Sequence, residues 1–583
     1  MIDARSDDLR SGRERSFRFE EPTAVLEARH VGEVVGTLEA AESAARRGLW
    51  AVGFVAYEAA PAFDPALLVH PPVPDLPLAW FALFARRVEV DPPPPAVDAS
   101  ADEAPSPWRP TVDAATYRDR IATIREAIAA GDTYQVNYTV RLRARVEGDA
   151  RGLYRDLALA QRGGHATYLD TGRHRIVSAS PELFFALDRG TITTRPMKGT
   201  AARGRFEDED ITIAAELRTS AKDRAENAMI VDLLRNDLGR IARPGTVAVP
   251  AMFDLERYET VWQLTSTVTC EPRPGTTLAD AFRALFPCGS VTGAPKVRTM
   301  ERIRELEDAP RGVYCGAIGW VGPGDGADIT ASFNVAIRTV AIDGATGDAE
   351  YGVGGGITYA SDADHEYAEV LAKARLLTTT RPAFELLETL RVDADGYADL
   401  EEHLERLAAS ARYFGFAFDA AAARADLERQ RADARHPRRV RLALARDGAR
   451  TLTTAELPED PGGPVEVELD DDPVDPSDVW LFHKTTRRAA YDRRAARHDR
   501  EAILVNDRGE VTETPIANVA VRIDGSWWTP PRQAGLLAGT ARARLLREGT
   551  LRERTITRDE LRSADELALV SSVRGWRAAT LVG

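Results

Sequence analysis

The feature that most limits how this chain can fold is a break near Pro382, where one series of strand and helix patterns ends and a second series begins. Strand and helix patterns run without a break from Tyr117 to LAKARLLTTTRP (371–382), and FELLETLRVDADG then opens a new strand and turn. The amphipathic helix pattern HLERLAASARYFGF follows, within a remainder of about 200 residues, a normal domain size. We therefore predict two mixed α/β modules, residues 1–380 and 381–583, with a proline-rich linker or loop at 91–110.

Composition narrows the classes of function. Lys and Arg total 76 against 91 Asp and Glu, a net charge of −15, so the chain lacks the basic character that nucleic acid or an anionic membrane requires. Its three cysteines, Cys270, Cys288 and Cys315, form no CxxC pair and cannot build a disulfide framework. The N-terminal segment lacks an apolar signal region, and no apolar run is long enough to span a bilayer. We expect a cytoplasmic protein.

Two acidic pairs stand at i, i+3 spacing within helical patterns. They are Asp223 with Glu226, and Glu366 with Glu369. This spacing places each pair on one helical face. Two such faces brought together would offer oxygen ligands suited to Mg²⁺. Taken alone, each pair is more typical of a solvated acidic face.

Three segments combine glycine with threonine: MKGT (197–200), GSVTGAPK (289–296) and YGVGGGIT (351–358). Glycine lets backbone N–H groups approach an anion closely, although each segment alone is more typical of a turn. GSVTGAPK is not a phosphate-binding P-loop, because Ala-Pro follows its second glycine. VGGGIT lacks the GxGxxG spacing of a dinucleotide fold. Kinase and dehydrogenase interpretations are therefore not favoured.

Taken in order, these and further segments resemble the chorismate-utilising enzymes, the family of anthranilate synthase component I, isochorismate synthase and aminodeoxychorismate synthase component I. The matching segments are SASPELFF (178–185), RPMKGTAARG (195–204), AENAMIVDLLRNDLGR (225–240), GSVTGAPKVRTMERI (289–303), YCGAIGW (314–320), AIRT (336–339), GVGGGIT (352–358) and the EYAEVLAKAR helix. The resemblance extends from about residue 15 to residue 380. It implies an α+β chorismate-binding fold, with large antiparallel sheets flanked by helices.

The resemblance also implies a site for each part of chorismate. Glu226 and Glu369 would hold an Mg²⁺ ion that binds the ring carboxylate, and Asp223 and Glu366 would flank this ion. A buried dianion needs such a cation, together with a guanidinium and N–H groups. The other residues that the resemblance implies for substrate binding are Tyr314 and Arg338 at the enolpyruvyl carboxylate, and Gly199, Thr200, Thr292, Gly293, Gly354, Gly356 and Lys373 around the anion.

Lys198 decides the subclass within this family. Aminodeoxychorismate synthases resemble this chain in carrying lysine here, whereas anthranilate synthases typically have alanine before Gly-Thr. In the family mechanism, this lysine adds to the ring while Glu182 acts as general acid on the departing 4-hydroxyl. Ammonia then enters at C4 and expels the lysine. A surface lysine beside a turn is the alternative, which the surrounding motifs disfavour.

The second module resembles the fold-type IV pyridoxal-phosphate (PLP) enzymes, which include branched-chain and D-amino-acid aminotransferases and 4-amino-4-deoxychorismate lyase. The resemblance implies a two-part α/β domain. Lys484 would hold the cofactor, and Glu513 would pair with its ring nitrogen. The residues that this resemblance implies for the phosphate are Arg406, Thr540 and Ser571, together with Gly539 where a helix starts and with Ser572.

The two resemblances fit consecutive steps, from chorismate to 4-amino-4-deoxychorismate and then to 4-aminobenzoate, a folate precursor. One alternative is an anthranilate-type synthase fused to an aminotransferase, which Lys198 disfavours. A non-catalytic metabolite sensor is another, because the N-terminal part of some family members binds tryptophan. No cysteine lies in a GxCxGxQ motif, so use of glutamine would need a separate glutaminase subunit. Whether the second module forms a dimer stays open.

Overall fold

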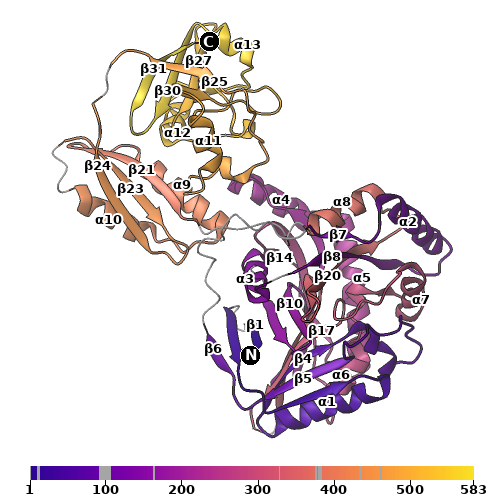
Figure 1. The fold of residues 1–583 in the computed structure, drawn as a ribbon. Coiled ribbons are helices and arrows are strands. Elements are labelled where there is room, and N and C mark those ends of the chain that lie inside the picture. The colour runs from indigo at the N-terminus through magenta and orange to yellow at the C-terminus, as the bar shows by residue number, and fades with distance from the viewer. Residues whose placement is uncertain are drawn as a thin grey trace. The chain divides into compact units, whose positions relative to one another are not determined.

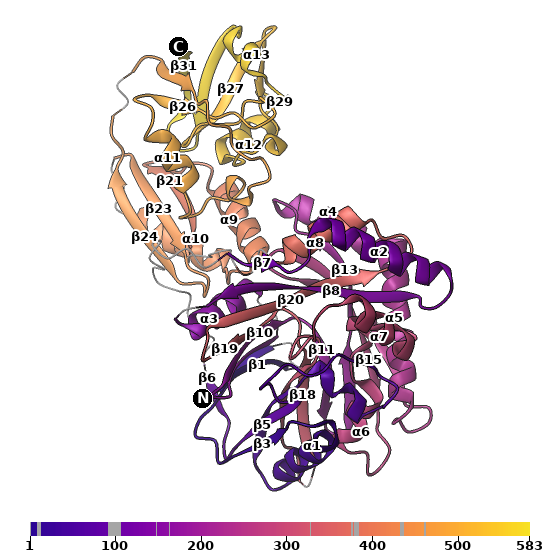
Figure 2. The ribbon, with the colours of Figure 1, turned by 45° about the vertical axis from the view of Figure 1, so that its right-hand side comes forward.

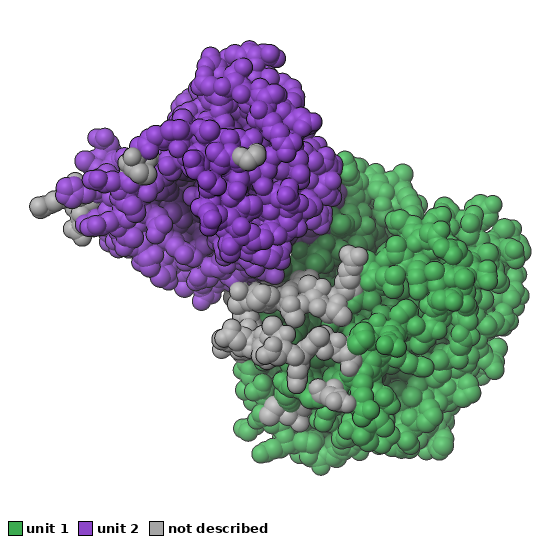
Figure 3. All heavy atoms as spheres, turned by 45° about the horizontal axis from the view of Figure 1, so that its top comes forward, with its two compact units in different colours: residues 1–202, 214–383 green, residues 203–213, 384–583 purple. Residues whose placement is uncertain are grey.

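The computed structural model describes residues 2–8, 13–90, 107–146, 148–161, 164–326, 328–374, 377, 384–431, 436–459 and 462–582. The chain forms two compact units (Figures 1 and 3). Unit 1 comprises residues 1–202 and 214–383, and unit 2 comprises residues 203–213 and 384–583. The predicted module boundary at residue 380 lies outside the described residues, as do residues 91–106 of the proline-rich segment.

Unit 1 contains two large sheets whose paired strands are all antiparallel. The first follows the order β16–β8–β20–β19–β10–β9–β1–β2–β6, with β7 beside β8. Its strands are β1 (Ile2–Asp8), β2 (Arg13–Phe19), β6 (Val88–Val90), β7 (Arg109–Pro110), β8 (Gln135–Arg145), β9 (His165–Asp170), β10 (His174–Ser180), β16 (Gly293–Ala294), β19 (Thr339–Asp343) and β20 (Asp348–Ile357).

The second sheet follows the order β13–β15–β12–β11–β18–β17–β4–β5–β3, with β14 beside β15. Its strands are β3 (Ala24–Ala28), β4 (Trp50–Val55), β5 (Ala79–Phe84), β11 (Leu183–Asp188), β12 (Thr191–Arg195), β13 (Met197–Ala202), β14 (Ala248–Arg257), β15 (Val261–Cys270), β17 (Ala317–Pro323) and β18 (Ile329–Val335).

The two sheets pack face to face, and helices cover their outer faces (Figure 2). Phe19 of the first sheet shares a buried core with Phe54 and Phe84 of the second. The helices α1 (Val31–Arg46), α5 (Ala221–Gly239) and α6 (Leu278–Leu285) pack on the second sheet, while α2 (Ala114–Ala129), α3 (Ala150–Gln161) and α8 (Ala363–Ala374) pack on the first. A further helix, α7 (Lys296–Leu306), contributes to both helix-covered cores. These layers confirm the predicted antiparallel sheets flanked by helices.

Unit 2 also has two parts, which confirms the predicted fold class. The first is a four-stranded antiparallel sheet in the order β22–β21–β23–β24, covered by α9 and α10. Its elements are β21 (Leu386–Asp393), β22 (Gly396–Tyr397), α9 (Leu400–Phe414), α10 (Ala420–Arg431), β23 (Arg438–Leu444) and β24 (Arg450–Glu456).

The second part is a mixed seven-stranded sheet in the order β26–β25–β31–β30–β27–β28–β29. Its elements are β25 (Val465–Leu469), α11 (Ala489–Ala495), β26 (Glu501–Ile503), β27 (Asn518–Ile523), β28 (Ser526–Thr529), α12 (Thr540–Arg547), β29 (Arg552–Glu553), α13 (Arg558–Arg562), β30 (Glu566–Ser571) and β31 (Gly575–Leu581).

Residues 203–213 belong to unit 2, although they lie in the sequence between two stretches of unit 1. The helix α4 (Glu207–Thr219) begins in this segment. Phe206 is 5% exposed and packs in one core with Phe482 and Tyr491. Arg203 forms a buried ion pair with Asp210 at 2.7 Å. The segment therefore contributes Phe206 to a core of unit 2, which the sequence did not indicate.

Candidate active sites

Unit 1 contains a cavity of about 300 Å³ whose walls come from both sheets and from α5 and α8. Strands β8 and β20 form one wall, in a register that sets Gly354 opposite Thr139 and Gly356 opposite Asn137. Most of the predicted residues of the first module line this one cavity. They are Glu182, Lys198, Gly199, Thr200, Asp223, Glu226, Tyr314, Arg338, Gly354, Gly356, Glu366, Glu369 and Lys373.

Thr292 and Gly293 are not among the residues that line the cavity. The Thr292 hydroxyl donates to the carbonyl oxygen of Cys288 at 3.0 Å, within its own turn. A Cβ at Gly293 would lie 2.1 Å from the backbone oxygen of Gln135, because this glycine pairs closely with β8. Both residues hold the turn that presents Ser290 and Val291 to the cavity.

Lys198 and Glu182 face the same cavity. Glu182 is 3% exposed, and its Oε1 has no hydrogen-bond partner among the described residues. Burial raises the pKa of Glu182 to about 7. Burial also lowers the pKa of Lys198, although Glu226 and Glu182 act in the opposite direction. A carboxyl that titrates near neutrality can donate a proton, and a lysine with a lowered pKa is more readily a neutral nucleophile.

The four acidic residues approach the cavity from two helices. Asp223 and Glu226 lie on α5, and Glu366 and Glu369 lie on α8. Burial raises the pKa of Glu226. Glu369 instead forms an ion pair with Lys373 at 2.8 Å, and Lys373 also donates to the carbonyl oxygen of Gly354 at 2.9 Å. The facing pairs predicted from the i, i+3 spacing therefore meet at one cavity.

Arg338 and Tyr314 provide the groups expected for a second carboxylate. Arg338 lines the cavity, and no carboxylate of the described residues lies within ion-pair distance of it. Burial lowers its pKa. The Tyr314 ring packs against β20, where a Cβ at Gly352 would lie 2.2 Å from the ring. Only glycine at residue 352 leaves room for this ring.

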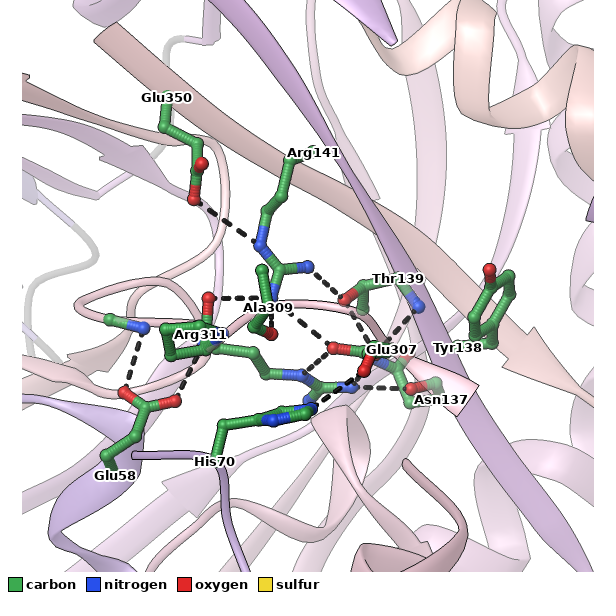
Figure 4. Close-up of polar contacts among 12 residues, drawn as sticks. Glu58, His70, Asn137, Tyr138, Thr139, Arg141, Glu307, Ala309, Arg311 and Glu350 are labelled. Atoms are coloured by element: carbon green, nitrogen blue, oxygen red, sulfur yellow. Dashed lines mark hydrogen bonds and ion pairs between the residues drawn. The ribbon is translucent and has the colours of Figure 1, made fainter. Parts of the chain in front are cut away.

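Figure 4 shows a buried ionic network around Glu307. Its Arg141 guanidinium lies near the Tyr314 ring. Glu307 accepts two hydrogen bonds from Arg311, at 2.6 and 3.0 Å, and one from the Thr139 hydroxyl at 2.8 Å. Arg141 lies 3.4 Å from Glu307, and its guanidinium carbon is 6.0 Å from the Tyr314 ring centre. This network ties β8 to the segment that leads into Tyr314.

Gln135 on β8 is not among the residues that line the cavity, but it lies beside Lys198 at Gly356, and the sequence did not indicate it. It is 2% exposed, and neither of its amide atoms has a hydrogen-bond partner among the described residues. A Cβ at Gly356 would lie 2.3 Å from Gln135 Nε2 and 2.8 Å from Lys198 Nζ, so the amide and the amine meet at this glycine. A buried amide without partners is costly, and a bound ligand could supply them.

The signal for Gln135 was present but ambiguous. Alternate residues of β8 are polar, and such a pattern ordinarily marks a strand with one solvent-exposed face. Here the polar face is buried. Its members, at 2 to 7% exposure, are Gln135, Asn137, Thr139 and Arg141.

In unit 2, Lys484 and Glu513 lie near one another. Burial lowers the pKa of Lys484 to about 8, with the positive charge of Arg406 acting in the same direction. Glu513 is 5% exposed, and burial raises its pKa to about 7. It accepts hydrogen bonds from the Tyr491 hydroxyl at 2.8 Å and from the Leu537 N–H at 2.9 Å. An amine and a carboxyl with shifted pKa values are typical of a functional site.

The residues predicted for a phosphate fall into two groups. Arg406 donates to the carbonyl oxygen of Ala538 at 3.1 Å, next to Gly539 and the start of α12 at Thr540. Ser572 lies 2.9 Å from His403, which also lies 3.3 Å from Thr540. The Ser571 hydroxyl accepts from the Arg574 N–H at 3.2 Å, and so stabilises the turn between β30 and β31. Through Glu388 and His403, the structure joins Arg406, Thr540 and Ser572 in one hydrogen-bonded cluster. Gly539 directly precedes Thr540 in the chain but donates to Asn518, and Ser571 has no hydrogen bond to the cluster.

Comparison with known proteins now fixes the family. Residues 3–379 match the profile of chorismate binding enzymes, which covers well over half of the chain. The chain belongs to the chorismate-binding enzyme family. Residues 385–582 match the profile of class IV amino-transferases. Unit 2 is thus a fold-type IV domain, which supports PLP as its cofactor.

Three relatives show how far the similarity extends. The chain is 42% identical over 285 residues to an aminodeoxychorismate synthase of Streptomyces griseus, covering 48% of this chain and 39% of that protein. It is 40% identical over 292 residues to anthranilate synthase component 1 of Streptomyces coelicolor, covering 50% and 56%. The solved structure of anthranilate synthase component I from Streptococcus pneumoniae matches with a TM-score of 0.55 and 27% identity, over 63% of this chain and 92% of that one. The chain spans between 39% and 56% of the length of the two curated relatives.

The residues at the two sites fit the two bound groups that the resemblances imply, Mg²⁺ in unit 1 and PLP in unit 2. Among the described residues, no three or more His, Cys, Asp or Glu side chains gather into a metal site by themselves. Glu226 and Glu369 nevertheless suit Mg²⁺, which takes one or two protein carboxylates and completes its shell with water and substrate oxygens. In unit 2, an amine, a guanidinium, two hydroxyls and a helix start suit PLP. A Cβ at Gly539 would lie 2.0 Å from Asn518 Oδ1, so only glycine fits at this helix start.

The cysteines are buried, and burial raises the pKa of Cys288 to about 12 and those of Cys270 and Cys315 to about 11. Thiols in this state are poor nucleophiles. Within the part of the chain that the structure describes, no helix has both the length and the apolar character needed to cross a bilayer.

Proposed function

We propose that this chain makes 4-aminobenzoate in two steps, amination of chorismate in unit 1 and elimination of pyruvate in unit 2. The observation that carries the proposal is the meeting of Lys198 and Glu182 in one cavity with the carboxylate pairs of α5 and α8. The similarity to an aminodeoxychorismate synthase supports the same reaction. The class IV amino-transferase match supports the second step.

In unit 1, the residues would act on the dianion chorismate. Arg338 and Tyr314 would bind one carboxylate through charge-assisted hydrogen bonds. An Mg²⁺ ion held by Glu226 and Glu369 would supply positive charge at the other carboxylate. A cation is needed there because burial of the two negative charges of chorismate would otherwise be costly.

The chemical step would use Lys198 and Glu182. The neutral amine of Lys198 forms a bond to the ring while the C4–O bond breaks, and Glu182 gives its proton to the departing hydroxyl, which leaves as water. Ammonia then forms a bond at C4, and the lysine amine leaves. The buried Glu182 suits a general acid, because its pKa of about 7 keeps the proton available near neutral pH.

In unit 2, PLP would supply an electron sink for the elimination. Lys484 would take the C4 proton, since its lowered pKa leaves much of the amine neutral near pH 8. Glu513 would hold a proton at the ring nitrogen of the cofactor. Loss of pyruvate then makes the ring aromatic, which drives the step.

We further propose that ammonia reaches unit 1 either free or from a separate glutaminase. Two similar proteins are named component 1 or component I, which supports a partner component. The three buried cysteines of this chain are not poised for glutamine hydrolysis.

Incubation of the full chain with chorismate, ammonium, Mg²⁺ and PLP tests the proposal, with the aromatic product identified by chromatography and mass. We expect 4-aminobenzoate, and none from Lys198→Ala. Anthranilate as the product would instead favour the alternative of an anthranilate-type synthase fused to an aminotransferase. Formation of 4-amino-4-deoxychorismate by Lys198→Ala at the rate of the unsubstituted protein would contradict the role of this lysine.

A further inference from the structure

Glu388 on β21 is a buried carboxylate in unit 2. It connects the residues predicted for the phosphate, because it contacts Arg406 directly and reaches Thr540 and Ser572 through His403. It is 1% exposed. Its oxygens accept from Arg406 Nε at 2.9 Å and from Arg406 Nη2 at 2.6 Å, and one of them lies 2.6 Å from His403 Nδ1. Both partners lie on one face of α9, three residues apart. Although burial alone would raise it, the charges of Arg406 and His403 lower the pKa of Glu388 to about 2, so it is ionised at neutral pH.

Arg406 is held by this carboxylate and still has donors to spare. A guanidinium carries five N–H groups in a rigid fork. Two of them go to Glu388 and one to the carbonyl oxygen of Ala538, which leaves two for a ligand among the contacts of the described residues. An arginine side chain has many rotamers and loses conformational entropy when it is fixed. The bidentate contact with Glu388 orders the side chain before any ligand arrives.

His403 connects the Glu388 carboxylate to two hydroxyl groups. Its Nε2 lies 2.9 Å from Ser572 Oγ and 3.3 Å from Thr540 Oγ1. Nδ1 of His403 faces the Glu388 carboxylate, and Nε2 faces the hydroxyl oxygens of Ser572 and Thr540. A hydroxyl whose oxygen accepts from an Nε2–H group keeps its own hydrogen for an anion. His403 itself is 1% exposed, so we expect it to orient the two hydroxyl groups without contacting a ligand.

We propose that Glu388 and His403 are the positioning residues of the phosphate site: Glu388 aims the guanidinium of Arg406, and His403 turns the hydroxyls of Thr540 and Ser572, toward one phosphoryl dianion. This inference rests on the proposed use of PLP by unit 2. Neither residue touches the ligand. Both set the directions of the groups that do, because a buried dianion is stabilised only by donors that already point at it.

The test compares PLP with pyridoxal, which has the same ring and aldehyde but no phosphate. Dissociation constants for both are measured on the full chain by the absorbance change of the bound cofactor. We expect Glu388→Gln to weaken PLP binding about tenfold or more, the effect that loss of an outer-shell partner has on metal affinity. Pyridoxal binding should change far less, so the preference for PLP over pyridoxal should fall.

His403→Asn provides a second variant in case Glu388→Gln does not fold. The asparagine amide reaches the position of Nδ1 and can keep the contact with Glu388, but it loses the contact with Ser572 and Thr540. It should therefore lower the preference for PLP with little effect on stability. Asp470→Asn is the matched control, since Asp470 is an equally buried carboxylate of unit 2 that pairs with Arg494 and Arg497. It should leave the preference unchanged.

Unchanged PLP binding in both variants, or parallel weakening of PLP and pyridoxal, would overturn the positioning role. Failure of the unsubstituted chain to bind PLP at all would overturn the proposed cofactor as well, and so is distinguishable from the first two results.

Discussion

At the scale of single residues, Gln135 shows that a site can be built at a cost to the ligand-free protein. Both of its amide atoms are buried without partners beside Lys198. Replacement of such a group by an apolar side chain of similar shape is often neutral or stabilising. Methionine has nearly the same length and adapts to irregular space.

We therefore expect Gln135→Met to raise the free energy of unfolding by about 1 kcal/mol, or to leave it unchanged, while the kcat/KM of chorismate amination falls at least tenfold. Denaturant titration and steady-state kinetics measure the two effects. Gln161→Met is the control, because Gln161 is also buried with an unpartnered Nε2 but lies on α3 and not beside Gly356 and Lys198. Equal activity of Gln135→Met and the unsubstituted protein would show that no ligand uses this amide.

Much of the site follows from sequence at this scale, and the exceptions have physical causes. Lys198 and the acidic pairs were predicted because their motifs are local, with the helical spacing visible in the sequence. Thr292 and Gly293 of GSVTGAPK are not among the residues that line the cavity, because sequence does not show which side of a tight turn faces a cavity. Gln135 was missed because burial of a polar strand face depends on partners far away in the sequence, as the contacts of Thr139 and Arg141 with Glu307 show.

At the scale of elements, the buried network around Glu307 fixes β8 against the segment that precedes Tyr314. Removal of one partner from a buried ion pair leaves the other charge uncompensated, which costs about 3–5 kcal/mol. We expect Glu307→Gln to lower the stability of unit 1 by about this amount, as measured by denaturant unfolding.

Glu350→Gln serves as its control. Glu350 also pairs with Arg141, at 3.5 Å, but its side chain is 32% exposed, so its loss should cost less than about 1 kcal/mol. Equal destabilisation by the two substitutions would mean that burial of Glu307 does not increase its contribution to the free energy of unfolding.

The segment 203–213 is the second element with a testable role. Phe206 fills a core of unit 2 beside Phe482, two residues before Lys484. Phe206→Ala should lower the stability of unit 2 by about 3–5 kcal/mol, the usual cost of a large cavity. Retention of PLP during a urea titration reports this loss, since Lys484 belongs to unit 2.

Phe185→Ala is the matched control for Phe206→Ala. Phe185 is 1% exposed in unit 1, so its replacement should destabilise that unit and leave PLP retention unaltered. Loss of PLP retention in Phe185→Ala but not in Phe206→Ala would contradict the assignment of Phe206 to unit 2.

At the scale of the whole molecule, two modules were visible in the sequence because each has its own run of strands and helices. Residues 203–213 were not assigned to the second one, since their packing partners lie more than two hundred residues away in the sequence. Local patterns carry no information on contacts of that separation.

If the proposed sites lie in separate units, substitution in one unit should abolish one proposed step and spare the other. We expect Lys484→Ala to lose the near-ultraviolet to visible absorbance of bound PLP and to accumulate 4-amino-4-deoxychorismate from chorismate and ammonium. Glu226→Gln should show the reverse, a weakened Mg²⁺-dependent amination with elimination of pyruvate from supplied 4-amino-4-deoxychorismate retained. Chromatography of both reaction mixtures measures the outcome. Loss of both steps in both variants would point to one composite site.

The placement of residues 203–213 bears on how such a gene could be divided. A fission after codon 383 would produce two polypeptides, and the first would carry eleven residues whose packing partners are encoded by the second. The second product would emerge with a gap in its interior at the position of Phe206. The single chain keeps both sides of this core in one polypeptide.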